Sequence, residues 1–521
     1  MIPSCLRHTE LPGTSRLFAD FLYRFDHVGS FYRHNPWRAE SYREAVRSLD
    51  YPAERRQALA AALREINEDS DALAKLASPG TVAVVTGQQV GLFSGPCYTI
   101  YKALTAVRLA AKLEADGIPA VPVFWLATED HDFAEVNHAW CFDARQTPVL
   151  HTVPANGGGH RPVGGIAVAN FPVDGLRRAL AEFPFGEEVS AAVAESYSSG
   201  RTMGDAFLAL LKRLLPGMGL LYLDPMQPAI REIAAPLLAR AVERDGEMTA
   251  RLLARSRELE AAGYHAQVHF EEKTSFFFSL EGGERVTLRR AGDRYGPYSR
   301  AELAARAGHL SPNALLRPVV QDYVLPTVVQ IGGPAEIAYL AQTQVLYDVL
   351  DRPAPVVAPR GGFTLLDARA AKLLERYGLS VTDCAEGLDP LREKIAARLV
   401  PPALRERMQG TRTVIENALE ALRGELAAFD PTLAASLDKS RAKIRHQAAK
   451  ISGKTARECL RRDARAEEEA SYLSRLLFHD RHPQERIYTI LPFLARHGPD
   501  LVGRLRESVS LECPDHLVLT L

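Results

Sequence analysis

The sequence has few of the features that mark secreted, membrane-spanning or zinc-stabilised proteins. No apolar run approaches the ~18 residues that a membrane-spanning helix needs, and the opening segment MIPSCLRHTELPG contains no apolar stretch of signal-peptide length. The six cysteines are dispersed without a Cys-x-x-Cys pair, which argues against a zinc ribbon or finger. We therefore expect a cytoplasmic protein with reduced thiols, no membrane partner and no assigned metal ligands.

An excess of charge of either sign is also missing. Lysine and arginine number 63 against 64 aspartates and glutamates, so the formal net charge is −1 and no global field would hold nucleic acid. The composition is 46% hydrophobic and 24% charged, which is typical of a globular protein. A chain of 521 residues is too long for one hydrophobic core, so we expect roughly two to four domains.

Short apolar runs bounded by glycine and proline predict a parallel sheet. The runs at 81–85 and 120–127 flank an expected helix at 98–116, and together they form a βαβ unit, which is almost always right-handed. Further short apolar runs occur at 220–223, 328–331 and 355–359. The sequence therefore predicts an α/β protein with a Rossmann-like, doubly wound parallel sheet.

Other segments depart from this pattern and divide the chain into predicted domains. Gly282-Gly283 between two alternating segments predicts a β-hairpin. Apolar residues at heptad-like spacing on both sides of Asp430-Pro431 predict an antiparallel helical hairpin, and we expect this hairpin to form a homodimer. The predicted parts are a core (1–144, 201–261 and 316–384), two insertions (145–200 and 262–315), a coiled-coil hairpin (385–480), and a segment that returns to the core (481–521).

A glycine-rich loop follows the first predicted strand. In an open α/β sheet, ligands bind beyond the carboxyl ends of the strands, and the start of a helix favours an anion. The loop lacks the Gly-Lys-[Ser/Thr] ending of a nucleotide-binding P-loop, and a turn that serves only packing explains the pattern equally well. The candidate ligand-binding residues here are Thr86, Gln88, Gln89, Gly95, Pro96, Tyr98, Thr99 and Lys102.

Acidic residues follow the second predicted strand. Neighbouring carboxylates and an imidazole can hold a magnesium ion, bind an amine or act as a general base. The alternative is a solvated loop whose aspartate caps the next helix. The candidates are Glu129, Asp130, His131 and Asp132, with Trp125, Asn137 and His138 beside them. A third strand-to-helix turn adds Gly332, Gly333 and Glu336, although helix capping alone accounts for those three equally well.

Four segments resemble a known family. They are TGQQVGLFSGPCYTIYK (86–102), PVFWLATEDHDFAEVNH (122–138), LRPVVQDYVLPTVVQIGGPAEIAYLAQ (316–342) and HPQERIY (482–488). In this order they resemble the signature segments of the bacillithiol-biosynthesis cysteine-adding enzymes. The resemblance implies a Rossmann-like core related to class I nucleotidylyl transferases, with two inserted connecting-peptide domains and a C-terminal coiled coil that dimerises.

The resemblance also implies a reaction. Members of the family are thought to join cysteine to the amine of glucosaminyl-malate, so we expect an amide-forming ligase with ATP or ADP and Mg²⁺ as cofactors. Glu129 to Asp132 and Lys102 are then the catalytic candidates, while Gln484, Arg486 and Tyr488 of the HPQERIY segment are the nucleotide-binding candidates. Where the nucleotidylyl transferases carry His-x-Gly-His, this chain has Ser94-Gly95-Pro96-Cys97, so activation through an adenylate or through a phosphate stays open.

Two other functions fit the same residues. One is a different amide ligase of the nucleotidylyl-transferase type. The other is a non-catalytic binding protein in which the Rossmann-like core is a platform and the coiled coil recruits partners. Substrate trials separate the first from the cysteine ligase, and the second predicts that changes in the loop at 129–132 are tolerated.

Overall fold

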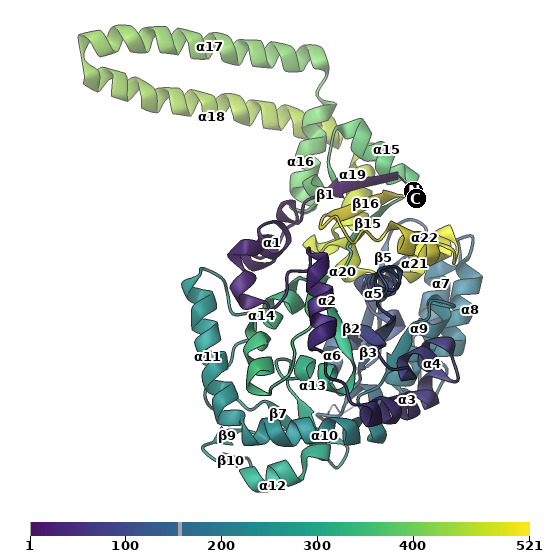
Figure 1. The fold of residues 1–521 in the computed structure, drawn as a ribbon. Helices are drawn as coiled ribbons and strands as arrows, with labels where there is room; N and C mark the ends of the chain where they lie inside the picture. Colours follow the sequence, from purple (N-terminus) through teal and green to yellow (C-terminus); the bar gives the residue numbers. More distant parts are fainter. Residues whose placement is uncertain (1, 155–158) are drawn as a thin grey trace. The chain divides into compact units, whose positions relative to one another are not determined.

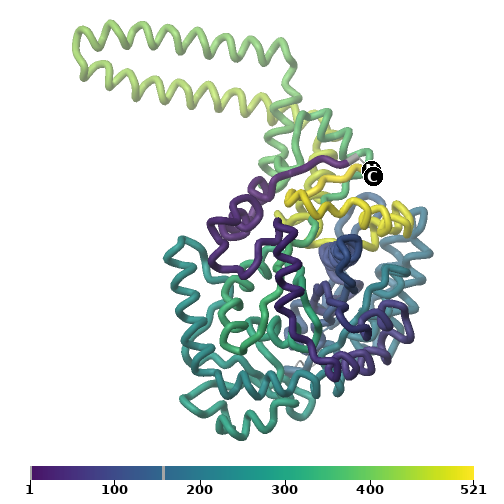
Figure 2. Tube along the Cα trace, in the orientation of Figure 1, coloured from purple at the N-terminus to yellow at the C-terminus, as the bar shows by residue number. Residues whose placement is uncertain are grey.

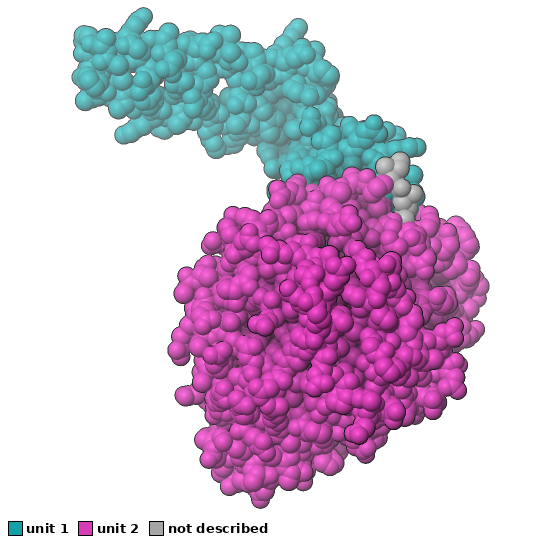
Figure 3. All heavy atoms as spheres, viewed as in Figure 1, with its two compact units in different colours: residues 1, 365–484, 520–521 teal, residues 2–364, 485–519 magenta. Residues whose placement is uncertain are grey.

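The computed structural model describes residues 2–154 and 159–521, which fold into two compact units (Figure 3). The larger unit comprises residues 2–364 and 485–519, and the smaller one comprises residues 365–484 and 520–521. Among the described residues, no helix is both long enough and apolar enough to cross a membrane.

A five-stranded parallel sheet forms the centre of the larger unit (Figure 1). Its spatial order is β14-β13-β2-β3-β6, and the pairs in register include Val85 with Val123 and Gln330 with Val85. In chain order this is the 3-2-1-4-5 arrangement of a Rossmann-type sheet, which reverses direction between β2 and β13. The predicted fold class is thereby confirmed. The strands are β2 (Val82–Gln89), β3 (Ala120–Ala127), β6 (Leu221–Leu223), β13 (Thr327–Gly332) and β14 (Val356–Pro359).

Alternating residues of β2 enter different hydrophobic clusters. Val82 and Val84 pack with residues of α5 (Tyr98–Ala115) on one face, and Ala83 and Val85 pack on the other face. The second face is covered by α3 (Ala53–Asn67), α4 (Asp71–Ala77), α10 (Pro228–Glu243), α13 (Arg317–Val324) and α14 (Pro334–Val349). Because both faces are covered, the strands are continuous apolar runs, as the sequence shows.

A hairpin that the sequence did not reveal leads from the predicted core into the first insertion. Strands β4 (His138–Phe142) and β5 (Pro148–Thr152) pair antiparallel. The insertion continues with α7 (Val173–Leu180) and α8 (Gly186–Ser196), and α9 (Met203–Leu214) leads back to the core. Residues 155–158, within the predicted first insertion, lie outside the described part of the chain.

The second insertion contains the predicted β-hairpin. Strands β7 (Phe277–Glu281) and β8 (Glu284–Thr287) pair antiparallel, and β12 (Leu310–Pro312) joins the other side of β7. Gly282 and Gly283 have φ of 58° and 82°, the positive values that a two-residue turn of this kind requires. The prediction of the turn is confirmed.

The remaining elements of the larger unit are shorter or peripheral. They are β1 (Ile2–Leu6), α1 (Arg16–Tyr23), α2 (Ala39–Ser48), α6 (Phe133–Val136), α11 (Asp245–Ala261), β9 (Arg290–Ala291), β10 (Arg294–Tyr295), β11 (Tyr298–Ser299), α12 (Arg300–Ala305), α21 (Leu491–His497), α22 (Leu501–Ser508) and β16 (His516–Thr520). The chain passes between the units within β15 (Phe363–Leu366) and α20 (Gln484–Ile487).

The smaller unit is helical and is dominated by two long antiparallel helices (Figure 2). Asp430 separates these helices and caps the second one by accepting a hydrogen bond from the Thr432 amide at 2.8 Å. Salt bridges such as Arg441–Glu416 at 2.8 Å join them, and the predicted hairpin is confirmed. The helices are α15 (Ala368–Tyr377), α16 (Leu388–Leu399), α17 (Pro402–Phe429), α18 (Pro431–Arg461) and α19 (Ala464–Leu477).

The boundary of this unit differs from the predicted one. The sequence prediction assigns 365–384 to the core, but α15 packs against α19 within the helical unit. Arg376 and Tyr377 of α15 both contact the buried carboxylate of Glu469. An amphipathic helix next to a strand is compatible with either partner in the sequence, so only the packing decides its assignment.

Candidate functional site

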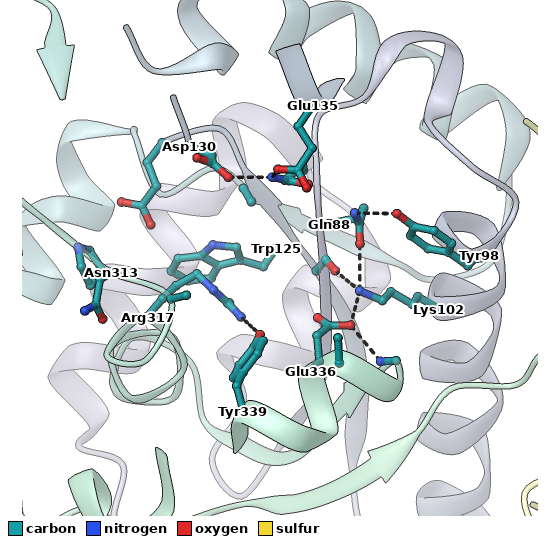
Figure 4. A pocket seen from close by; sticks show the side chains of 18 of the residues that line it. Gln88, Tyr98, Lys102, Trp125, Asp130, Glu135, Asn313, Arg317, Glu336 and Tyr339 are labelled. Atoms are coloured by element: carbon teal, nitrogen blue, oxygen red, sulfur yellow. Dashed lines mark hydrogen bonds and ion pairs between the residues drawn. The ribbon is translucent and has the colours of Figure 1, made fainter. Parts of the chain in front are cut away.

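A cavity of about 530 Å³ lies in the larger unit, beyond the carboxyl ends of the strands. Residues from the ends of β2, β3 and β13 line it (Figure 4), so it coincides with the point at which the strand order reverses. Basic and acidic side chains are mixed in its wall. The charged lining residues are Lys102, Arg285, Arg317, Arg360, Arg486, Glu129, Asp130, Glu135 and Glu336.

Ten of the predicted site residues line this one cavity. They come from three segments that span residues 88–336 and from the HPQERIY segment near the end. The ten are Gln88, Gln89, Tyr98, Lys102, Trp125, Glu129, Asp130, Gly333, Glu336 and Arg486. The predicted residues that do not line it are Thr86, Gly95, Pro96, Thr99, His131, Asp132, Asn137, His138, Gly332, Gln484 and Tyr488.

Lys102 is held by three acceptors at the cavity wall. Its ammonium group donates to the Gly87 carbonyl at 2.9 Å and to Gln88 Oε1 at 2.8 Å, and it forms an ion pair with Glu336 Oε2 at 2.5 Å. Burial lowers the pKa of Lys102, and Glu336 opposes that shift. All three ammonium protons therefore have partners, and Lys102 ties the end of β2 to the start of α14.

Gln89 connects the first loop to the acidic loop. Its side-chain amide donates to Asp130 Oδ2 at 2.7 Å and to Glu135 Oε2 at 2.8 Å. Burial raises the pKa of Asp130, but the hydrogen bond from Gln89 and the charge of Arg285 outweigh burial and lower it overall. Asp130 is therefore a fixed, ionised carboxylate at the cavity.

Arg285 reaches this loop from β8 of the second insertion. Its guanidinium lies 3.0 Å from His131 Nδ1 and 3.7 Å from Asp130 Oδ1, and it donates to Ser311 Oγ at 2.9 Å. Burial and the positive charge of Arg285 lower the pKa of His131. His131 is thereby kept neutral and supports the cavity wall without lining it.

Glu129 is the most buried acid of the loop, with 3% of its surface exposed. Its Oε2 accepts a hydrogen bond from Ser311 Oγ at 2.8 Å. Burial raises its pKa, although Arg285 and the Ser311 hydroxyl act in the opposite direction. The end of β3 thus carries two carboxylates whose pKa values are shifted in opposite directions, upward for Glu129 and downward for Asp130. This arrangement favours different chemical roles for the two.

Arg317 and Arg360 are two further guanidinium groups of the cavity lining. Arg317 donates to the Tyr339 hydroxyl and to Gln321 Oε1, both at 3.0 Å. Arg360 pairs with Glu485 through two hydrogen bonds of 2.9 and 2.5 Å. Burial raises the pKa of Glu485, but Arg360 reverses this shift and lowers it to about 2. The hydrogen bonds of Arg317 and the Arg360–Glu485 ion pair fix cationic groups at the cavity.

The start of α5 does not open into the cavity as predicted. The Cys97 amide donates to the Tyr488 carbonyl at 2.8 Å, and Tyr488 is fully buried. Tyr98 and Lys102, one turn apart on the same helix, are the residues that face the cavity. The anion-binding role expected of Gly95 and Pro96 therefore has no support in the cavity lining.

Several other predicted residues have structural partners. Asp132 caps α6 by accepting from the Glu135 amide at 3.2 Å, which is the alternative that the sequence left open. Asn137 donates to the Val153 carbonyl at 2.9 Å, and His138 Nδ1 lies 3.2 Å from the Ala134 carbonyl. Gln484 donates to the carbonyls of Leu365 and Leu476 within the smaller unit.

Comparison with known proteins adds an independent observation. The family model described as "Bacillithiol biosynthesis BshC, N-terminal Rossmann-like domain" matches residues 4–361. The model for the C-terminal coiled-coil domain of the same proteins matches residues 363–521. This chain belongs to the bacillithiol biosynthesis BshC family. The resemblance stated from the four sequence segments is thereby confirmed.

Curated relatives within the BshC family are similar over their whole length. The chain is 55% identical over 520 residues to a protein of Solibacter usitatus, covering 99% of each chain. It is 35% identical to a protein of Koribacter versatilis, covering 100% of each, and 31% identical to one of Salinibacter ruber, covering 96% of each. All three carry the name "Putative cysteine ligase BshC", which supports the expected enzyme class, a ligase.

The sequence prediction missed the residues that the second insertion and its exit bring to the BshC-family cavity. Phe278 and Arg285 come from the β7–β8 hairpin, and Asn313 and Arg317 follow β12. The guanidinium of Arg285 lies over the Phe278 ring, 3.9 Å from its centroid. Arg317 stands within the family segment at 316–342, which was the one available signal for it.

Potential metal ligands of the described residues converge away from the cavity. The group in which three potential ligand atoms converge within 4.8 Å is Cys5, Cys513 and Asp515, and none of them lines the cavity. At the cavity, Asp130 and Glu135 share the amide of Gln89 and so offer two neighbouring carboxylates. Magnesium is usually held by one or two carboxylates together with phosphate oxygens, and this pair fits that pattern.

Proposed function

We propose that this chain joins L-cysteine to the amine of glucosaminyl-malate and forms an amide in the last step of bacillithiol biosynthesis. The cavity at the strand reversal carries the proposal, because it combines fixed guanidinium groups with carboxylates of opposite pKa shift. The names of the full-length relatives support a cysteine ligase.

The reaction needs an activated carboxylate, because an amide does not form in water from a free carboxylate and an ammonium ion. ATP supplies that activation by giving the carboxylate a phosphate-based leaving group. Arg317, Arg360 and Arg486 line the cavity and are suited to phosphate and carboxylate oxygens. Glucosaminyl-malate brings carboxylates of its own, so the same side chains would position both substrates.

A magnesium ion accompanying ATP fits the pair Asp130 and Glu135. Both carboxylates accept from Gln89 Nε2, at 2.7 and 2.8 Å, which holds them at a fixed separation. Arg285 and Gln89 keep Asp130 ionised, as a metal ligand must be. Of the predicted nucleotide-binding residues, only Arg486 lines the cavity, so we assign the nucleotide contact to Arg486.

The attacking amine must lose a proton before it bonds to the activated carbon. The side chains of this chain prepare that step by excluding water from the wall and by fixing the carboxylates. Trp125 and Glu129 are nearly fully buried, so charges interact more strongly there than in water. Binding both substrates in one cavity also raises the rate, because the reaction between them becomes effectively unimolecular.

The decisive experiment supplies the purified protein with glucosaminyl-malate, L-cysteine, ATP and Mg²⁺. Bacillithiol is then measured by mass spectrometry after the thiol has been labelled. Product that requires all three substrates is the expected result. Omission of ATP is the control for activation, and serine in place of cysteine is the control for the thiol substrate.

The two alternative functions give different results in the same assay. An amide from another amine or another amino acid, with no bacillithiol, would identify a different ligase of the same type. Binding of the substrates without any turnover, even after ATP addition, would indicate a non-catalytic platform. Either outcome would remove the proposed reaction.

We also infer a homodimer formed through the α17–α18 hairpin. The family model for residues 363–521 describes a coiled-coil domain, and no residue of α17 is buried in the single chain. Large apolar side chains are exposed along both helices. They are Leu404, Val414, Leu422, Phe429, Leu433, Ile444 and Ile451. A second copy of the hairpin would cover them.

A further inference from the structure

Two buried polar atoms of the cavity wall have no hydrogen-bond partner in the described part of the chain. They are Oε1 of Glu129 and Nε1 of Trp125. The two side chains are 3% and 1% exposed, and both line the cavity. An unpaired buried acceptor or donor destabilises a fold, and an unpaired charged one does so more strongly. Such atoms therefore point to a partner that the folded chain alone does not contain.

The two atoms require complementary groups. Glu129 Oε2 already accepts from Ser311, whose hydroxyl also accepts from Arg285, so Oε1 is the oxygen left for a ligand. A carboxylate accepts hydrogen bonds and prefers a cationic donor, whereas an indole nitrogen can only donate. A ligand that satisfies both must carry a cationic donor and an acceptor.

We propose that Glu129 and Trp125 form the subsite for the free amino acid substrate. Oε1 of Glu129 accepts a hydrogen bond from the α-ammonium group, and Nε1 of Trp125 donates to a carboxylate oxygen. The identity of the amino acid as cysteine rests on the proposed function. The subsite itself rests on the two unpartnered atoms, so the two claims can fail separately.

The amine of the sugar substrate does not suit this position. It must be deprotonated to attack, and an ion pair with a buried carboxylate would retain its proton. The amino acid's own amine has the opposite requirement, because it takes no part in the new bond and is best kept protonated. Glu129 meets that requirement by holding the α-amine as ammonium.

The neighbouring charges are compatible with an amino acid at this place. Figure 4 shows the Trp125 ring next to the Arg317 side chain, whose guanidinium points toward Tyr339. Arg317 also lines the cavity and adds a cationic donor for the substrate carboxylate. Asp130, on the same loop as Glu129, is engaged by Gln89 and Arg285 and so is a weaker candidate for the ammonium.

The test uses three ligands that differ by one group. L-Cysteine carries the ammonium and the carboxylate, 3-mercaptopropionate lacks the ammonium, and cysteamine lacks the carboxylate. Their dissociation constants are measured by calorimetry on the full-length protein and on two variants, Glu129→Gln and Trp125→Phe. Glu232→Gln removes an exposed carboxylate from α10 and is the matched control for the change of charge.

The expected pattern is a crossed one, in which each variant weakens the binding of a different pair of ligands. Glu129→Gln raises the dissociation constants of cysteine and cysteamine by about tenfold or more and leaves that of 3-mercaptopropionate unchanged. Trp125→Phe raises the dissociation constants of cysteine and 3-mercaptopropionate by about three- to tenfold and leaves that of cysteamine unchanged. The control variant binds all three as the wild type does. A ligand that keeps its affinity also shows that the variant is folded.

Two results would overturn the subsite. If Glu129→Gln weakened the binding of all three ligands equally, Glu129 would have a structural role. If it left the affinity for cysteine unchanged, water or another group would occupy Oε1. Because the assay measures binding, it is independent of turnover. If the purified protein formed no bacillithiol but showed the crossed pattern of binding, the proposed reaction would be contradicted and the amino acid subsite would still be supported.

Discussion

At the scale of single residues, neighbours in the acidic loop have different environments. Asp130 lines the cavity and is fixed by Gln89 and Arg285, whereas Asp132 is exposed and caps α6. The sequence treats the two aspartates as equivalent, because each follows the same strand by a few positions. Only the direction of the side chains separates a cavity carboxylate from a helix cap.

We predict that Asp130→Asn and Asp132→Asn have unequal effects. Asp130→Asn removes the charge at the cavity and lowers turnover by about 100-fold, a loss of the size expected for a positioned catalytic or metal-binding carboxylate. Asp132→Asn keeps turnover within about twofold, because asparagine caps a helix as well as aspartate does. Steady-state rates of bacillithiol formation measure both. Equal losses would mean that the loop acts as a whole.

Lys102 shows how far sequence reasoning extends at this scale. Its spacing from Tyr98 correctly indicates a shared helix face at the cavity. The sequence suggests that its ammonium holds an anionic ligand. In the structure the ammonium instead donates to Gly87 and Gln88 and pairs with Glu336. Local spacing predicts where the side chain points, whereas one of its partners, Glu336, comes from a segment more than two hundred residues away.

At the scale of elements, the sheet could be predicted because its signals are local. Each core strand is an apolar run bounded by glycine or proline, and β2, β3 and β13 all follow this rule. The cavity residues of the second insertion could not be predicted in the same way. Arg285 is one of several charged residues in a hairpin, and only the fold of that hairpin brings it to His131, 154 positions earlier.

The close approach of β2 and β3 makes a prediction about Gly87. A Cβ atom at this position would lie 2.9 Å from the Trp125 carbonyl oxygen and 3.1 Å from its Cβ. Gly87→Ala must therefore push the strands apart, and we expect it to lower the free energy of unfolding by about 1–3 kcal/mol. The displaced Trp125 should also weaken cysteine binding.

Gly165→Ala is the matched control for this change. A Cβ at Gly165 would meet no atom within 4 Å, so its effect should stay within about 0.5 kcal/mol. Denaturant titrations of the two variants measure the difference, and calorimetry measures the binding. A Gly87→Ala protein as stable as the control would show that the strands can separate without cost.

At the scale of the whole molecule, the helical hairpin is the part whose surface least resembles that of a monomer. Val414 and Ile451 are 69% and 58% exposed, and Phe429 at the end of α17 is 83% exposed. The salt bridges Arg441–Glu416 and Arg423–Asp438 hold the two helices to each other and leave these apolar side chains outside. A partner surface of the same kind would bury them and contribute roughly 25 cal/mol per Å².

We predict that the purified protein has twice the 57.3 kDa mass of one chain in light scattering after size-exclusion chromatography. The double variant Val414→Asp, Ile451→Asp should run as a monomer, because burying two carboxylates in an apolar interface is strongly unfavourable. Ser440→Asp, an exposed change on α18, is the control and should stay dimeric. Since the cavity residues all belong to the larger unit, monomers should retain cysteine binding. A dimeric double variant would place the interface elsewhere.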